Sequence, residues 1–411
     1  METPISNHKP ALVGPNSTYR WFVVILGALT MACTMGMPAA GMIVLFDEIS
    51  LDLNLDLVQI GVIVGVGPLV GLATGIFGGA VGDQFGTNKT LAVGAILGGV
   101  FGALRGISDS FISLIVMVSL ASIIIPAIPV NVHKACGQWF PSRQLGLANG
   151  IASMGMASGA IVGSMISATL LSPLLGSWRY VLVFYGILSI MIGITWLFVR
   201  PIPGQRSVGG FSENALSVLQ GIRQVANVKR IWALGLSMMA IGGANMAMMS
   251  YLPLYLRDIG WSSASADGTV SLFYAISMVS VIPITMLSDR LGSRKLILVL
   301  GGLAATICAA FLAIPGGSFV LLAICFGGIF RDGFMAIIMT TITETDGIGS
   351  ELSGAATGMV TTLSRIGGVF SPPVGNSLAS YGSSTPFVLW SVLALIGTAG
   401  MFSIKERRKA M

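Results

Sequence analysis

Residues 288–295 read Ser-Asp-Arg-Leu-Gly-Ser-Arg-Lys, a short polar stretch between two long apolar segments. A related stretch, Gly-Asp-Gln-Phe-Gly-Thr-Asn-Lys, occupies residues 82–89, so Asp289 repeats Asp83 at an offset of 206. Farther along, Gly-Leu-Ala-Asn-Gly at 146–150 is matched by Gly-Ala-Ala-Thr-Gly at 354–358, an offset of 208. Both offsets are close to half of the 411-residue length. We therefore interpret the chain as an internal duplication.

The composition is that of a chain that crosses a membrane many times. Hydrophobic residues make up 54%, charged residues only 9%, and the mean hydropathy is +0.88. Soluble domains carry about 25% charged residues. The net charge is +6, but the basic residues lie between apolar segments and form no continuous stripe, which argues against nucleic-acid binding.

Twelve segments are long and apolar enough to be expected as membrane-spanning helices. They are 20–46, 57–81, 88–107, 110–132, 145–171, 178–200, 229–256, 267–287, 294–314, 318–343, 352–378 and 384–404. The predicted fold is an all-α polytopic membrane protein with two pseudo-symmetric six-helix bundles. The bundles are expected at 20–200 and 229–404, between an N-terminal tail (1–19), a linker (201–228) and a basic C-terminal tail (405–411).

The basic residues predict the orientation. With the N-terminus inside, seventeen Lys and Arg residues fall in inside segments and three in outside segments. Cytoplasmic loops carry such an excess, so both termini are expected in the cytoplasm and the protein in the cell (inner) membrane. In the linker, Ser212 is a candidate N-cap and Leu216, Leu219 and Ile222 share one helical face. This pattern predicts a short amphipathic helix on the membrane surface.

No pattern in the sequence indicates catalysis or metal binding. The four cysteines, Cys33, Cys136, Cys308 and Cys325, are widely spaced and include no CxxC pair. We expect reduced packing residues, with no metal site and no cofactor. A clustered nucleophile, base or metal-ligand set is also missing from the sequence, so we do not expect an enzyme.

The chain resembles the major facilitator superfamily over essentially its whole length. The superfamily motif between spans 2 and 3 has a glycine, an Asp-Arg pair, a second glycine and basic residues. Residues 79–89 resemble this motif, with Gln84 in place of the arginine. The second copy, at 288–295, resembles it more fully. The resemblance implies secondary transport by alternating access, with the motif as a cytoplasmic latch. Internal repeats flanking a central site are typical of such transporters.

One further stretch is similar to the organic-anion branches of the superfamily. Trp-Phe-Pro-Ser-Arg at 139–143, followed by Gly-Leu-Ala-Asn-Gly at 146–150, resembles the junction of helices 4 and 5 in several of them. These are the oxalate/formate and monocarboxylate porters, the anion:cation symporters and the nitrate/nitrite porters. The eighth span lacks the arginine expected of oxalate/formate and nitrate porters, so the resemblance does not select one branch.

Three charged residues lie deep in predicted spans: Arg331 and Asp332 in the tenth, and Arg365 in the eleventh. A charge at mid-membrane costs about 2.5–3.5 kcal/mol, so such residues are functional candidates. Adjacent residues point about 100° apart on a helix. We therefore expect Asp332 to pair with Arg365, or to couple protons, and Arg331 to face the cavity. The resulting net charge of +1 predicts an anion site, since guanidinium groups bind carboxylates in bidentate fashion.

Other candidates surround this site in the superfamily's architecture. Asn245, Tyr274 and Asn131 are candidate substrate contacts, with interhelical hydrogen bonding as the alternative. A cytoplasmic gate is expected from five charged residues: Asp83, Asp289, Arg290, Arg294 and Glu344.

These features predict a secondary transporter of a small organic anion, expected to be a carboxylate, coupled to protons or to a counter-anion. We expect it to work as a monomer in the lipid bilayer. One alternative is a multidrug/proton antiporter of the same fold, although the fifth span lacks the proline of the GxxxGPxxGG-like run typical of those exporters. The other is a transporter-like sensor that binds a ligand without moving it.

Overall fold

The computed structural model describes the chain except residues 1–17, 75–80, 83, 201–222, 346 and 405–411. The described part is helical and contains no strand. Its first half contains α1 (Tyr19–Met31), the π-helix η1 (Ala32–Gly36), α2 (Met37–Leu53), α3 (Leu57–Thr74), α5 (Thr87–Leu104), η2 (Arg105–Ile107), α6 (Phe111–Ile124), α7 (Ala127–Trp139), α8 (Ser142–Ile166), η3 (Ser167–Leu171), α9 (Ser172–Leu175) and α10 (Trp178–Leu197). Its second half contains α12 (Lys229–Asp258), α13 (Ser263–Leu291), α14 (Arg294–Leu312), α15 (Val320–Thr343), α16 (Gly349–Ser377), η4 (Leu378–Tyr381) and α17 (Thr385–Phe402).

Ten described helical segments are long and apolar enough to cross a membrane. Each of the twelve predicted spans overlaps a described helix, and the two outside the ten are α3 and α16. The apolar part of α3 ends at Leu72, next to the undescribed residues 75–80. α16 has 29 residues but is rich in glycine, serine and threonine. The predicted amphipathic helix lies outside the described residues, as do most of the two predicted tails.

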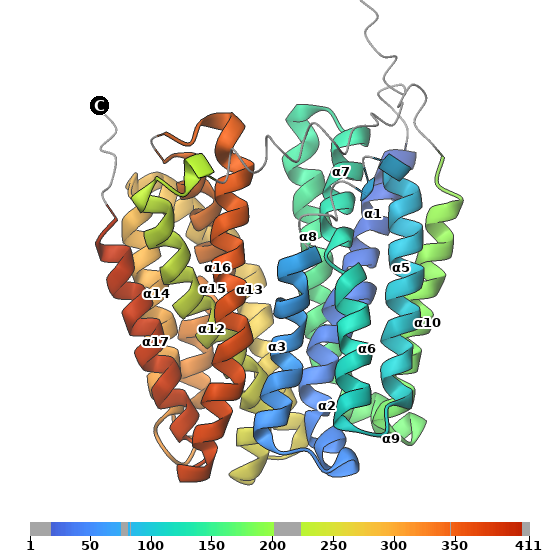
Figure 1. Ribbon diagram of the computed structural model, residues 1–411, viewed down its shortest axis with the longest axis vertical. Helices are drawn as coiled ribbons and strands as arrows, with labels where there is room; N and C mark the ends of the chain where they lie inside the picture. The colour runs from blue at the N-terminus through green and yellow to red at the C-terminus, as the bar shows by residue number, and fades with distance from the viewer. Residues whose placement is uncertain (1–17, 75–80, 83, 201–222, 346, 405–411) are drawn as a thin grey trace, which may run out of the picture.

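The helices run side by side along the long axis of the molecule (Figure 1). Helices α1 to α10 gather on one side and α12 to α17 on the other. We call the end where α1 begins and α17 ends the terminal face, and the end with the turn at Asn54, between α2 and α3, the distal face. The densest aromatic packing lies in the second half, where Tyr255 of α12 contacts Phe387 of α17 with ring centroids 5.0 Å apart.

Within the first half, α8 crosses η1 at a backbone-to-backbone contact. A Cβ atom placed on Gly159 would lie 2.6 Å from the carbonyl oxygen of Ala32, and one on Gly36 would lie 3.0 Å from the carbonyl carbon of Gly159. Real Cβ atoms essentially never come within 3.0 Å of other heavy atoms. Glycine is therefore what allows these two helices to meet at this distance.

The second half repeats this crossing between α12 and α16. Gly367, 208 positions after Gly159, would place a Cβ atom 1.9 Å from the carbonyl oxygen of Met239. Gly243, 207 positions after Gly36, would place one 2.7 Å from the carbonyl carbon of Gly367. These offsets agree with those between the sequence motifs. The duplication thus extends to the helix packing.

The turns after Asp83 and Asp289 are duplicated as well. Gly86 begins α5 with φ 89°, and Gly292 ends α13 with φ 65°. Both φ values are positive, which side chains rarely adopt, and both glycines follow their aspartate by three positions. The two copies of the motif therefore share a backbone requirement even where their charged residues differ.

The two halves meet along two seams, and two of the polar contacts there lie toward the distal face. On one seam, the Asn376 Nδ2 atom of α16 donates to the Leu57 oxygen of α3 at 2.7 Å. On the other, the hydroxyls of Ser164 in α8 and Ser271 in α13 are 2.8 Å apart. Leu57 and Ser271 belong to the distal parts of their helices, so these two contacts hold the halves together at the distal end.

The glycine crossing generates a stability prediction. Gly367→Ala should destabilise the protein by about 1–3 kcal/mol, because the added methyl group meets the α12 backbone. The measurement is the thermal unfolding midpoint of the purified protein in detergent. The matched control is Gly358→Ala on the same helix, where a Cβ atom would meet nothing within 4 Å. This control should be neutral or slightly stabilising. Equal midpoints for the two variants would contradict the crossing.

Candidate functional site

Arg331 and Asp332 form an ion pair in the middle of α15. The Arg331 Nη1 atom lies 2.8 Å from the Asp332 Oδ1 atom, and each side chain is about one third exposed (34% and 33%). The prediction that Asp332 would pair with Arg365 is wrong. The Cβ directions of adjacent helical residues do diverge, but the long arginine side chain curls back far enough to reach its neighbour. The two charges thus neutralise each other locally.

Aromatic and polar groups of α13 surround this pair. The guanidinium carbon of Arg331 lies 5.0 Å from the ring centroid of Tyr274 and 5.8 Å from that of Phe273. Cation–π attraction operates at such distances. The Asp332 amide nitrogen also donates to the Ser277 Oγ atom at 3.2 Å. The predicted candidate Tyr274 is therefore next to Arg331, and the pair connects α15 to α13.

Arg365 lies elsewhere, on the seam between the two halves. Its Nη1 atom donates to the carbonyl oxygen of Gly71 in α3, and its side chain is half-buried. Among the residues that the structure describes, no carboxylate forms an ion pair with it. The structure thus divides the predicted three-charge cluster into a neutral pair on α15 and a positively charged arginine on α16.

The surroundings of Arg365 come from three helices. One turn along α16, a Cβ atom on Gly368 would lie 3.0 Å from the Met246 sulfur of α12 and 3.2 Å from the Pro68 Cγ atom of α3. Asn245, the neighbour of Met246, is half-buried, and no hydrogen bond of its side chain is seen in the described part of the chain. Arg365 and Asn245 therefore belong to the region where α3, α12 and α16 meet.

Asn131 occupies a different environment. Its side chain has 0% exposure and donates to the Ala127 carbonyl oxygen at 2.8 Å. It also packs closely on Gly82, just before the turn of the first motif. A residue without exposed surface cannot contact a solute in this conformation. Its position favours the interhelical alternative over the substrate contact.

Three of the predicted gate residues come together at the terminal face. The Arg294 Nη1 atom lies 2.5 Å from Asp289 Oδ1, and its Nη2 atom lies 3.6 Å from Glu344 Oε1. Arg290 is exposed and forms no ion pair with another described residue. Asp83 lies outside the described residues. The observed contacts connect α13, α14 and the end of α15, all within the second half.

One charged pair was not singled out from the sequence. Arg257, at the end of α12, lies with its Nη2 atom 2.6 Å from Asp267 Oδ1 in α13, and both side chains are buried. From the sequence they looked like ordinary residues at the ends of spans 7 and 8. The sequence did contain a signal, because Asp267 is the first residue of the predicted eighth span and an ionised side chain there is costly.

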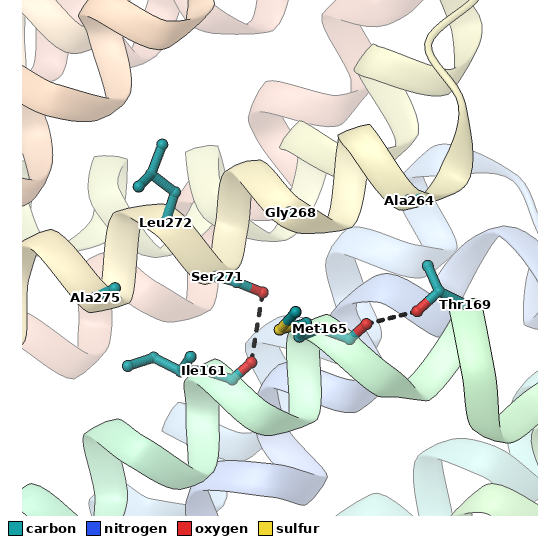
Figure 2. Close-up of a pocket in the computed structure, with 8 residues that line it drawn as sticks. All are labelled: Ile161, Met165, Thr169, Ala264, Gly268, Ser271, Leu272 and Ala275. Carbon is teal, nitrogen blue, oxygen red and sulfur yellow. Dashed lines mark hydrogen bonds between the residues drawn. The ribbon is translucent and has the colours of Figure 1, made fainter.

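A cavity of about 440 Å³ lies between α8, η3 and α13 (Figure 2). Its lining is mostly apolar and consists of Ile161, Met165, Thr169, Ala264, Gly268, Ser271, Leu272 and Ala275. Met165 and Leu272 are exposed, so the cavity opens on the outer surface of the second seam. None of the predicted site residues lines it.

Comparison with known proteins agrees with this architecture. The cis,cis-muconate transport protein of Acinetobacter baylyi is 23% identical over 98% of both chains. The nitrate/nitrite transporter NarK2 of Mycobacterium tuberculosis, described as probable, is 25% identical over 79% of this chain and 80% of its own. The 4-hydroxybenzoate transporter PcaK of Pseudomonas aeruginosa is 23% identical over 69% of each.

The fold also matches that of a solved transporter. A bacterial homologue of the human lysosomal transporter Spinster, in an inward-facing and unoccupied conformation, superposes with a TM-score of 0.77 at 15% identity. The superposition covers 94% of this chain and 97% of that one. The model of the Major Facilitator Superfamily matches residues 24–372. The chain therefore belongs to the major facilitator superfamily and is a membrane transporter rather than an enzyme.

Proposed function

We propose that this protein transports a small organic anion, a carboxylate, by alternating access between two six-helix bundles. The twelve spans comprise the ten long apolar segments together with α3 and α16. The repeated glycine crossings support the six-plus-six arrangement, because they fall at equivalent places in the two halves. The excess of basic residues in the predicted inside segments supports a cytoplasmic terminal face, and we propose the inner membrane as the location.

The observation that carries the proposal is the unneutralised guanidinium of Arg365. A charge in a membrane interior is costly, and a carbonyl oxygen offsets it only in part. No described carboxylate pairs with Arg365, so a bound anion would supply the missing negative charge. Its location also suits alternating access, because it contacts α3 in one half from α16 in the other.

We assign Arg331 a second role in anion binding, from the α15 pair, which lies apart from Arg365 in this structure. One of its two terminal nitrogens is bonded to Asp332, and a guanidinium has five N–H donors. The remaining donors are free to bind an anion, and the Tyr274 ring limits the directions of approach. Asp332 acts as the ion-pair partner that keeps Arg331 neutralised when no anion is bound. Asn245 and Tyr274 orient the polar end of the substrate.

The names of the relatives narrow the chemistry of the anion. Muconate and 4-hydroxybenzoate are carboxylates, and nitrate is also a planar anion with its charge spread over equivalent oxygens. Two coplanar oxygens match the two parallel N–H bonds of a guanidinium. We therefore propose a planar oxyanion head group, with a conjugated or aromatic carboxylate as the preferred substrate.

Substitution of Arg365 tests the site. Arg365→Gln should raise the dissociation constants of muconate and 4-hydroxybenzoate at least about tenfold, since a charge-assisted bidentate contact is lost. Arg365→Lys should recover only part of the affinity, because an ammonium group cannot form the paired contact. Binding is measured by ligand-induced thermal shift of the purified protein, and transport by uptake into proteoliposomes.

The control for this experiment is Arg223→Ala, which removes an exposed arginine far from the site in sequence and should leave binding unchanged. A second pair of substitutions, Arg331→Gln with Asp332→Asn, removes both charges of the α15 pair together. It should weaken binding without leaving an unpaired charge. Wild-type affinity of Arg365→Gln for every anion that binds would refute the assignment.

The terminal-face contacts generate a separate prediction. Arg294→Ala should increase hydrogen–deuterium exchange about two- to fivefold in the α13–α14 turn and at the end of α15, because a partly exposed ion pair contributes about 0.2–1 kcal/mol. Arg290→Ala should leave both segments unchanged, since Arg290 has no ion-pair partner among the described residues. Equal exchange in the two variants would show that Arg294 does not connect these helices.

A further inference from the structure

A buried charge cluster lies at the distal face, away from the proposed anion site. Its centre is Asp267, whose side chain has 0% exposure and whose Oδ1 atom lies 2.6 Å from Arg257 Nη2. The Arg257 side chain is 10% exposed. Both residues belong to the second half, at the end of α12 and the beginning of α13.

This ion pair is incompletely satisfied. In the described structure, the Asp267 Oδ2 atom is buried without a hydrogen-bond partner, as are the Nε and Nη1 atoms of Arg257. A buried polar atom without a partner costs about 1–3 kcal/mol, and more when it carries charge. Protonation of the second carboxylate oxygen of Asp267 would therefore lower this cost.

Two more carboxylates act on Asp267 from the other half of the molecule. Burial disfavours its ionised form most and Arg257 favours that form, while Asp47 and Glu48, on α2, add a smaller repulsion. Glu48 accepts a hydrogen bond from the Ser172 hydroxyl of α9. The cluster thus sets three acids against one arginine, and like charges in a shared site favour protonation of one of them.

The other helices that pack on α13 supply no closer charge. On α15, Arg331 and Asp332 contact Tyr274 and Ser277, about 10 Å or more along α13 from Asp267 at 1.5 Å per residue. The described charged residues of α14 are Arg294 and Lys295, at its terminal end, and η3 has none. On α8 the charged residue is Arg143, near the terminal end, and on α12 the remaining ones are Lys229 and Arg230 at the terminal end and Asp258 beside Arg257.

We propose that Asp267 is a proton-binding site that couples proton uptake to closure of the distal face. In the distal-open state its carboxylate takes a proton from hydronium: an O–H bond of hydronium breaks, an O–H bond forms at Oδ2, and water is released. Closure then buries a neutral acid at the face that also holds Asp47 and Glu48. Without the proton, closure would bury a third negative charge against the other two.

The sign of the pH dependence follows from this difference. The distal-closed state binds the proton more tightly than the distal-open state, so by linkage a low pH stabilises the closed state. Raising the pH removes the proton and favours the open state. A proton entering with the substrate from the distal side would thus be required for closure.

The inference rests on the proposed function only in assuming that the distal face opens and closes. The test uses the full-length protein in nanodiscs without substrate. Spin labels are attached at Leu51→Cys on α2 and Ser263→Cys on α13, two exposed positions near the distal face in different halves. Cys325→Ser removes the exposed native thiol, while Cys33, Cys136 and Cys308 are buried.

In the labelled protein without further substitutions, the population with the long label distance should rise about tenfold relative to the population with the short one between about pH 5 and about pH 8. This is within the usual range of coupling. Asp267→Asn should keep the short distance at both pH values. Arg257→Gln with Asp267→Asn should do the same, and this pair guards against misfolding caused by an unpaired arginine. Asp47→Asn with Glu48→Gln should move the transition to lower pH.

The control is Asp109→Asn, in the exposed turn between η2 and α6. Hydrogen bonds from Ser113 and Ser110 hold the pKa of Asp109 below its usual range, so it stays ionised throughout the titration. This variant should behave like the parent. A pH response in both Asp267 variants equal to that of the parent would overturn the proton site. Label distances that change with neither pH nor added anion would instead contradict alternating access itself.

Discussion

The structure depends most on the contacts between helix backbones at its duplicated glycines. At Gly36 with Gly159, and again at Gly243 with Gly367, no side chain fits between the helices. Within a lipid bilayer the hydrophobic effect does not drive helices together, so close backbone packing of this kind is a main source of association. It fixes the position of α8 on the first span and of α16 on α12. Arg365 is two residues from Gly367, so this crossing also places the guanidinium.

Each charged residue within the spans is paired with whatever partner its surroundings provide. Arg331 finds Asp332 on its own helix, and Arg365 finds a backbone carbonyl across the seam. Asp267 finds Arg257 but shares its surroundings with two acids. The Arg331–Asp332 pair is neutral, the Arg365 site lacks a negative charge, and the Asp267 site has an excess of negative charge. On the proposed function, these imbalances correspond to an anion site and a proton site at different depths.

The sequence predicted the helices well because each span is a long apolar segment with polar ends. It also predicted that Arg294 and Glu344 could meet, since both lie at the same end of neighbouring spans. It did not predict the Arg331–Asp332 contact, because Cβ directions on an ideal helix say little about the reach of a four-carbon side chain. The importance of Asp267 was missed because its burial and its contact with Arg257 become visible only once the helices are packed together. The glycine crossings were equally hidden, since 54 glycines give no sign of which ones touch another backbone.

Close glycine contacts occur both within the halves and on the α3–α16 seam between them. Within each half, a glycine crossing brings two backbones together, and any sliding would bring side chains into the gap. Between the halves, the described polar contacts are a few hydrogen bonds, such as those of Asn376 with Leu57 and of Ser164 with Ser271. Such bonds contribute about 0.5–1.5 kcal/mol each. On the α3–α16 seam, glycines also bring the two backbones together: a Cβ atom on Gly61 would lie 2.6 Å from Pro373 Cα, and one on Gly65 would lie 2.6 Å from the Val369 oxygen. On the proposed mechanism each half moves as a unit, and this close α3–α16 packing is what substrate binding must work against.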